Sequence, residues 1–102
     1  IKDVFKVHGR QVSPTEIEDV LLSHPLVVEA AVIGVPEVHA GSRPFAFVVL
    51  TTSPGAHHAA NEQIREHVNA QLASYKRIHE IRVVHSLPRS ASGKVLRRML
   101  KD

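Results

Sequence analysis

Two long apolar segments, 27–35 and 44–50, constrain the fold of this chain most. They read VVEAAVIGV and PFAFVVL, with hydrophobic residues at odd and even positions alike. A half-exposed strand would alternate apolar with polar residues, so both segments are predicted to be buried central strands. Residues 36–43 form a polar loop long enough for a wide turn, and we therefore expect the two strands to pair antiparallel.

A short hairpin is predicted at the start of the chain. Residues 4–7 and 10–12 are rich in β-branched and aromatic side chains, which favour strands, and His8-Gly9 between them favours a turn.

A helix is predicted to follow this hairpin. Ser13 and Glu16 have the spacing of a reciprocal capping box, and Pro14 suits the first helical position. We assign Glu16, Glu18 and Asp19 to capping and to the helix dipole, and we propose no acid-base pair among them. The apolar face of this helix consists of Ile17, Val20 and Leu21, and the helix is expected to end at His24-Pro25.

The remaining chain alternates between helix and strand patterns. Asn61 is expected to cap a second helix, residues 81–84 to form a strand, and residues 95–100 to form a last short helix. Ile64, Val68 and Leu72 would form the buried face of the second helix. The predicted fold is a single α+β domain over residues 1–102: a small, mainly antiparallel sheet with a short N-terminal hairpin, flanked by two or three helices.

Composition excludes several classes of protein. The chain has no cysteine, which excludes disulfides and thiolate metal sites and is compatible with a cytoplasmic location. Its apolar runs are far shorter than the roughly 20 residues of a membrane span. The neighbouring His57 and His58 lack partners at ligand spacing, so no metal site is predicted.

Residues 88–101 contain several basic side chains and no acidic one. The formal net charge of +3 favours an anionic partner. A loop rich in serine and glycine that presents Lys94 suits phosphate or carboxylate oxygens, and we place this lysine at a helix start. A P-loop is rejected because Val95 follows the lysine. A solvated basic end remains the alternative from spacing alone.

Three segments resemble the C-terminal domain of the adenylate-forming superfamily. Residues 88–98, PRSASGKVLRR, are similar to its pattern of proline, four residues, Gly-Lys, an apolar pair and arginine. Residues 5–18 resemble its hairpin and Pro-x-Glu helix, and residues 24–36 resemble its His-Pro to Gly-Val-Pro string. The superfamily includes acyl-CoA synthetases, coumarate-CoA ligases, luciferases and the adenylation domains of peptide synthetases.

This resemblance implies that residues 1–102 are the lid domain of a two-domain, AMP-forming acid-CoA ligase. The large N-terminal domain, absent from this chain, would be its partner, and the chain alone is expected to be inactive. The substrates would be ATP, CoA and a fatty or aromatic carboxylic acid. Mg²⁺ is expected with ATP but not bound by this domain. The resemblance leaves open which acid is activated, whether a carrier protein replaces CoA, and the oligomeric state.

The resemblance also implies roles for individual residues. Lys94 would be the catalytic lysine of adenylation, and Gln11 would assist it at the nucleotide. Gly9 would line the tunnel of the thiol, and Lys6 would assist thioester formation. Lys2 matches the hinge position of the family.

Departures from the family leave the CoA contacts open. His8 and Arg10 differ from the residues that often flank this glycine in the family, so their CoA contacts are not carried over. A hypothesis from charge and place is that Arg10 meets a CoA phosphate. Lys94 also matches the context in which some bacterial acyl-CoA synthetases are switched off by lysine acetylation, which would remove its charge.

The rival function is a free-standing basic module for nucleic acid or an anionic protein, although aromatic residues are too few for base stacking.

Overall fold

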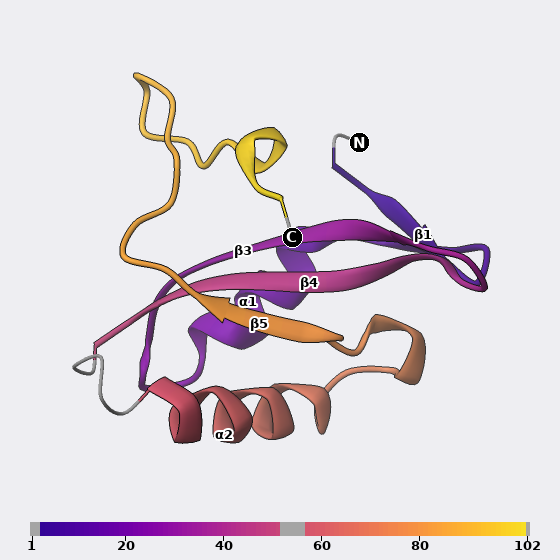
Figure 1. Ribbon diagram of the computed structural model, residues 1–102, viewed down its shortest axis with the longest axis horizontal. Coiled ribbons are helices and arrows are strands. Elements are labelled where there is room, and N and C mark those ends of the chain that lie inside the picture. The colour runs from indigo at the N-terminus through magenta and orange to yellow at the C-terminus, as the bar shows by residue number, and fades with distance from the viewer. Residues whose placement is uncertain (1–2, 52–56, 102) are drawn as a thin grey trace.

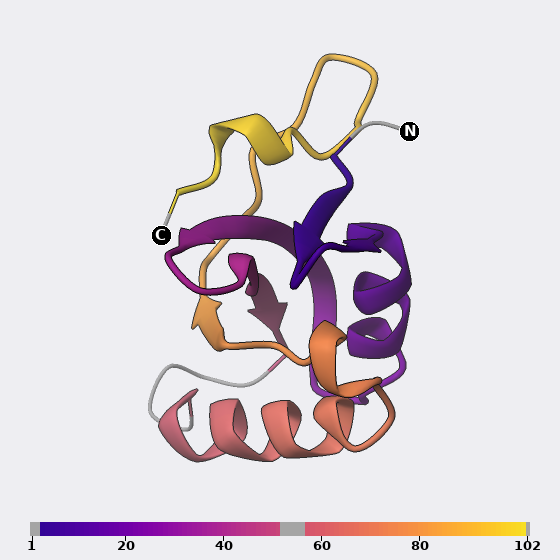
Figure 2. The same ribbon diagram turned by 90° about the vertical axis from the view of Figure 1, so that its right-hand side faces the viewer.

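The computed structural model describes residues 3–51 and 57–101. Five strands form one sheet, helices α1 and α2 cover one face, and the C-terminal segment crosses the other face (Figure 1, Figure 2). Within the described ranges, no helix combines the length and apolarity needed to cross a membrane. The predicted α+β class, with a mainly antiparallel sheet, is confirmed.

The N-terminal hairpin forms as predicted. Strands β1 (Phe5–Val7) and β2 (Arg10–Val12) pair antiparallel. The two turn residues, His8 and Gly9, have φ angles of 50° and 78°. Positive φ at both positions matches the twist of a two-residue hairpin, and glycine reaches it without steric cost. The His8 amide also donates a hydrogen bond of 2.8 Å to the Ala40 carbonyl, which attaches the turn to the sheet.

The central hairpin is antiparallel, as predicted, but its turn is shorter than expected. Strand β3 (Val27–Glu37) pairs with β4 (Gly41–Leu50) from Val27 opposite Leu50 to Glu37 opposite Gly41. The expected wide turn over residues 36–43 is wrong, because both strands continue into it. Of the two strands predicted to be central, only β4 lies inside the sheet, because β3 is at an edge. Both are apolar at odd and even positions because both faces of the sheet are covered.

Two separate hydrophobic clusters explain this pattern. Along β4, Ala46 and Val48 belong to the cluster under the helices, whereas Phe45 and Phe47 belong to the cluster under the C-terminal segment. Successive side chains of a strand point to opposite faces, so each cluster takes alternate residues. The second cluster is completed from the C-terminal segment by Leu87, Val95 and Leu100.

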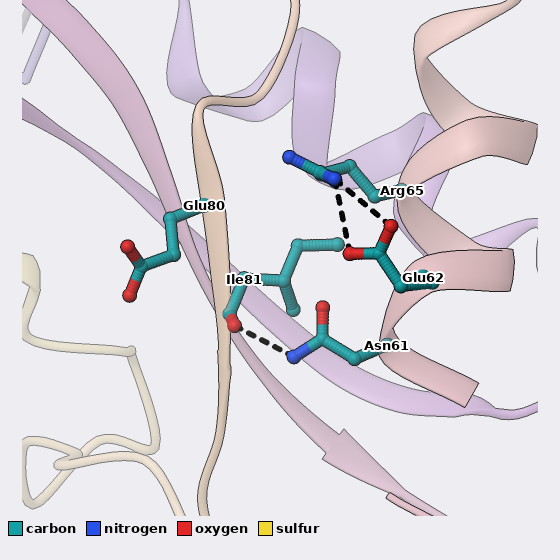
Figure 3. Close-up of a pocket in the computed structure, with 5 residues that line it drawn as sticks. All are labelled: Asn61, Glu62, Arg65, Glu80 and Ile81. Carbon is teal, nitrogen blue, oxygen red and sulfur yellow. Dashed lines mark hydrogen bonds and ion pairs between the residues drawn. The ribbon is translucent and has the colours of Figure 1, made fainter. Parts of the chain in front are cut away.

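A helix connects β4 to the last strand. Helix α2 (His57–Asn69) is followed by a 3-10 turn, η2 (Ser74–Lys76), and by β5 (Glu80–Val83), which pairs parallel to β4. The prediction that Asn61 caps α2 is wrong, because Asn61 lies inside the helix. Its side-chain amide donates a 2.8 Å hydrogen bond to the Ile81 carbonyl, and this bond joins α2 to β5 (Figure 3).

The start of helix α1 (Pro14–Leu22) also differs from the prediction. Pro14 stands in the first turn as expected, but Ser13 makes no side-chain capping bond. The Glu16 carboxylate instead accepts bonds of 2.5 and 2.8 Å from Lys76 Nζ. The predicted capping box is therefore wrong, because the carboxylate pairs with a full charge on η2 in place of a backbone amide.

Close packing at Gly34 gives a testable constraint on the fold. A Cβ added at Gly34 would lie 2.5 Å from Cγ of Phe5, which real Cβ contacts do not show. We expect Gly34→Ala to lower the free energy of unfolding by about 1–3 kcal/mol through overpacking. Urea unfolding measures this loss. Adding Phe5→Leu should recover part of it by making room, and equal losses in both backgrounds would contradict the steric explanation.

Candidate active-site segments

The segment that contains Lys94 is a compact loop rather than a helix start. Arg89 and Val95 form an isolated antiparallel bridge, and the Ser90 amide donates to the Lys94 carbonyl at 2.8 Å. Gly93 closes the turn with a φ of 90°. The predicted helix over 95–100 is wrong: only a 3-10 turn, η3 (Arg97–Met99), forms there. Leu96 donates back to the Pro88 carbonyl, which holds the chain in the loop.

Side chains reinforce this loop from within. Ser90 Oγ accepts from the Lys94 amide at 3.2 Å and lies 2.9 Å from Ser92 Oγ. Arg89 Nη1 donates to the Gly93 carbonyl at 2.7 Å, and Nη2 of the same residue pairs with the Glu29 carboxylate on β3. The Ser90 hydroxyl therefore binds the backbone within the loop and also contacts Ser92, and Arg89 connects the loop to the sheet.

The Lys94 side chain itself is exposed. Its ammonium group makes no hydrogen bond or ion pair with any residue in 3–51 or 60–101. A lysine held at a braced backbone position, with its three donors available, can bind phosphate or carboxylate oxygens that approach the loop.

The second candidate segment is the N-terminal hairpin. Lys6 lies directly opposite Gln11 in the register, so the two exposed side chains share one face of the hairpin. A Cβ on Gly9 would meet nothing within 4 Å. Gly9 therefore faces open space in this domain, and its positive φ is the local reason for glycine here.

The structure groups the predicted residues into two places. Lys6, Gly9 and Gln11 lie together on the hairpin. The loop of residues 89–95, in gold, lies away from the hairpin turn in both views (Figure 1, Figure 2). This domain does not bring Lys94 to the hairpin residues. Lys2, assigned to the hinge, lies outside the described residues, so its role stays a prediction.

A buried ion pair near the N-terminal end of the described chain was not predicted from the sequence. The Glu18 carboxylate is buried and accepts bonds from Arg97 at 2.8 and 2.5 Å. It also accepts from the Val32 amide at 2.8 Å, and Arg97 Nη1 reaches Asp3 at 3.1 Å. The bond to Glu18 raises the pKa of the Arg97 guanidinium above its ordinary value. The helix-dipole role assigned to Glu18 is therefore wrong.

These pairs change the electrostatics of the basic C-terminal segment. Arg89 and Arg97 are paired with acidic side chains from the body of the domain. Arg10 stacks over the Tyr75 ring at 5.0 Å. Among the described residues, no group of three or more His, Asp or Glu side chains is arranged to hold a metal ion. Because Arg89 is paired with Glu29, Lys94 is the basic residue of the 89–95 loop whose charge is available to a ligand.

A hollow between α2 and β5 is lined by several polar side chains. Arg65 binds Glu62 through bonds of 3.0 Å and Asn61 binds the Ile81 carbonyl, whereas Glu80 points away from both (Figure 3). The Arg65–Glu62 pair lies within α2, and the Asn61 bond joins that helix to β5, so both contacts serve the fold.

Known proteins are similar in sequence to this chain over most or all of its length. The family described as AMP-binding enzyme C-terminal domain matches residues 16–94. The chain is 48% identical over 102 residues to 4-coumarate-CoA ligase-like 9 of Oryza sativa subsp. japonica, covering 100% of this chain and 18% of that protein. It is 41% identical over 101 residues to acyl-CoA synthetase 7 of Caenorhabditis elegans, covering 99% of this chain and 18% of that protein.

A solved structure supports the same relationship. The o-succinylbenzoate CoA synthetase MenE from Bacillus subtilis, in complex with its acyl-adenylate intermediate, superposes with a TM-score of 0.85 at 38% identity. The match covers 98% of this chain and 20% of that one. The chain thus spans about a fifth of the length of the relatives it matches. By sequence and by fold, it belongs to the AMP-binding enzyme C-terminal domain family.

Proposed function

We propose that this chain is the mobile C-terminal domain of an ATP-dependent, AMP-forming carboxylic acid-CoA ligase. The observation that carries the proposal is the braced loop of residues 89–95, which holds the ammonium of Lys94 exposed and unpaired among the described residues. Membership of the family and the names of the relatives, which are CoA ligases and acyl-CoA synthetases, support this reading.

In the proposed first step, an oxygen of the substrate carboxylate attacks the α-phosphorus of ATP. The bond to the bridging oxygen breaks, pyrophosphate leaves and an acyl-adenylate forms. Negative charge concentrates on the phosphoryl and carboxylate oxygens as they meet. Lys94, fixed by its backbone bonds to Ser90, would offset that charge electrostatically. The acyl-adenylate in the related MenE complex is the kind of intermediate this step produces.

In the proposed second step, the thiolate of CoA attacks the acyl carbon, and AMP leaves. The hairpin would serve this step: Gly9 leaves space for the pantetheine chain, and Lys6 lies on the same face as Gln11. Gln11 is assigned to the nucleotide of the first step. Since Lys94 and Gly9 lie apart in the domain, each would reach the reacting centre in a different orientation of the domain, with rotation at Lys2.

The large N-terminal domain would supply the rest of the site. We assign it the acid pocket and the Mg²⁺ that accompanies ATP. The relatives' names include an aromatic acid, coumarate, and acyl groups in general, so we propose a fatty or aromatic acid as substrate. Assaying a panel of both classes of acid would identify it.

The test is carboxylate-dependent ATP-pyrophosphate exchange by the full-length enzyme. Lys94→Ala is expected to lower the exchange rate by about 100- to 1,000-fold, the usual loss when one transition-state donor is removed. Thioester formation from supplied acyl-adenylate should be retained. Lys101→Ala is the matched control, because Lys101 is an exposed lysine of the same segment whose contact with Arg82 uses its backbone carbonyl.

Exchange that survives Lys94→Ala at the wild-type rate would refute this assignment. The basic segment would then be read as a binding surface for an anionic macromolecule. Electrophoretic mobility shift with nucleic acid, at two salt concentrations, would test that rival, since phosphate contacts weaken as salt rises.

A further inference from the structure

The loop of residues 89–95 is attached to the sheet in two ways. At its base, Val95 packs with Leu87 in the hydrophobic cluster under the C-terminal segment. Arg89 stands opposite Val95 at the same base, and its guanidinium links the loop to the body by pairing with Glu29 on β3. Val95 is held by hydrophobic contact, whereas the Arg89 guanidinium ties the Gly93 peptide of the turn to the sheet.

The two ends of the Arg89 guanidinium have different partners. Nη1 donates to the carbonyl of Gly93, the residue before Lys94, at 2.7 Å. Nη2 pairs with the Glu29 carboxylate. One rigid, planar group therefore connects the peptide that precedes Lys94 to a strand of the sheet. Lysine has a single nitrogen at the end of a flexible chain and does not present this fork.

Stability does not account for this arrangement. The Arg89 and Glu29 side chains are 43% and 29% exposed, and an ion pair exposed to that degree contributes little to folding. The contact instead orders a turn whose closing residue is Gly93, with its positive φ. Without the guanidinium, the Gly93 carbonyl would lose its fixed partner on the sheet side, and the loop tip would gain freedom.

We propose that Arg89 and Glu29 form a positioning pair that sets the location of Lys94 for adenylation. This inference rests on the proposed function and deepens it. A displacement of about 1 Å at a reacting group can cost on the order of 100-fold in rate. The pair touches no substrate in this scheme and acts only through the Gly93 carbonyl and the backbone of Lys94.

The experiment uses the full-length enzyme and separates the two half-reactions. Arg89→Ala and Glu29→Gln are expected to lower the kcat of ATP-pyrophosphate exchange by about 10- to 100-fold. The KM for ATP and the rate of thioester formation from supplied acyl-adenylate should stay unchanged, as should the thermal midpoint. Arg89→Lys should behave like Arg89→Ala, because it keeps the charge and loses the fork.

Two further variants complete the design. Arg65→Ala is the matched control, since Arg65 forms an ion pair of similar arginine exposure, 37%, with Glu62 on α2 and should leave exchange unaffected. The double variant Arg89→Ala/Lys94→Ala should be no slower than Lys94→Ala alone. Residues that act through one group are not additive, so removing that group removes the effect of its positioner.

The outcomes distinguish the inference from the proposed function. If Lys94→Ala abolishes exchange while Arg89→Ala leaves it intact, the positioning role is overturned and the role of Lys94 stands. Full activity of Arg89→Lys would likewise overturn the bridging geometry. If Arg89→Ala lowers both half-reactions together with the thermal midpoint, the pair is merely structural. If Lys94→Ala itself is silent, the proposed function fails first.

Discussion

Replacing Arg97 with alanine is expected to destabilise the folded domain by about 3–5 kcal/mol, because it leaves a buried carboxylate without its cation. The Glu18 side chain is only 10% exposed and receives two bonds from the guanidinium. After the substitution, its remaining hydrogen-bond donor from the described part of the chain is the Val32 amide. One amide does not replace a full charge in a poorly hydrated site.

Urea unfolding at neutral pH measures this loss, with Arg98→Ala as the matched control. Arg98 is the neighbouring arginine and is exposed, so its replacement should change the free energy of unfolding by less than about 0.5 kcal/mol. Adding Glu18→Gln to Arg97→Ala should recover part of the stability, because the uncompensated charge disappears. A loss in Arg97→Ala no larger than in Arg98→Ala would show that the carboxylate remains hydrated.

Replacing Ile64 with alanine is expected to lower the free energy of unfolding by about 4 kcal/mol, within the range found for large cavities. Ile64 is fully buried on α2, in the cluster that joins the helices to the sheet. The bond from Asn61 to the Ile81 carbonyl ties α2 to β5 along the same interface. Because the helix is held in this way, the site should collapse only partly around the missing atoms.

The same unfolding experiment on Leu22→Ala provides the control. Leucine and isoleucine are isomers, so both substitutions remove the same atoms, but Leu22 is 46% exposed. Its replacement should cost about 1 kcal/mol or less. Similar losses for both variants would mean that the interface around Ile64 repacks, and that α2 is held less firmly than its bonds indicate.

Together, the ion pairs explain how the C-terminal segment is held without a helix. Arg97 binds α1 through Glu18 and reaches Asp3 near the chain entry, while Arg89 binds β3 through Glu29. Asp3 has a φ of 72°, a left-handed conformation that a non-glycine residue seldom adopts. In the proposed enzyme, the start and the end of the domain would therefore move as one body when it rotates.

Much of the fold could be predicted from local patterns. The hairpin at His8-Gly9 follows from turn residues between short β-branched segments, and the pairing of β3 with β4 follows from two apolar runs joined by a polar one. The candidate loop was also found in this way, because serine, glycine and lysine are adjacent in sequence. The hinge position, Lys2, came from resemblance alone.

Contacts between residues far apart in the sequence account for the predictions that were wrong. Ser13 and Asn61 have the chemistry of helix caps, but Asn61 binds β5, and Glu16 binds Lys76 in place of the cap. Residues 95–100, VLRRML, suit a short helix, yet Val95 and Leu100 pack, partly buried, against the second hydrophobic cluster without one. Local propensity amounts to a few tenths of a kcal/mol per residue, and burial or a charge pair outweighs it.

The sequence by itself determined the elements whose causes are local: the turn glycine, the alternation of strands and helices, and the loop rich in serine and glycine before Lys94. Only the tertiary structure decided which faces of the sheet are covered, that β5 runs parallel to β4, and that Arg97 pairs with Glu18. The physical reason is that an ion pair or a sheet register between residues far apart in the chain depends on the free energy of the whole packed arrangement. Local sequence patterns carry no record of that arrangement.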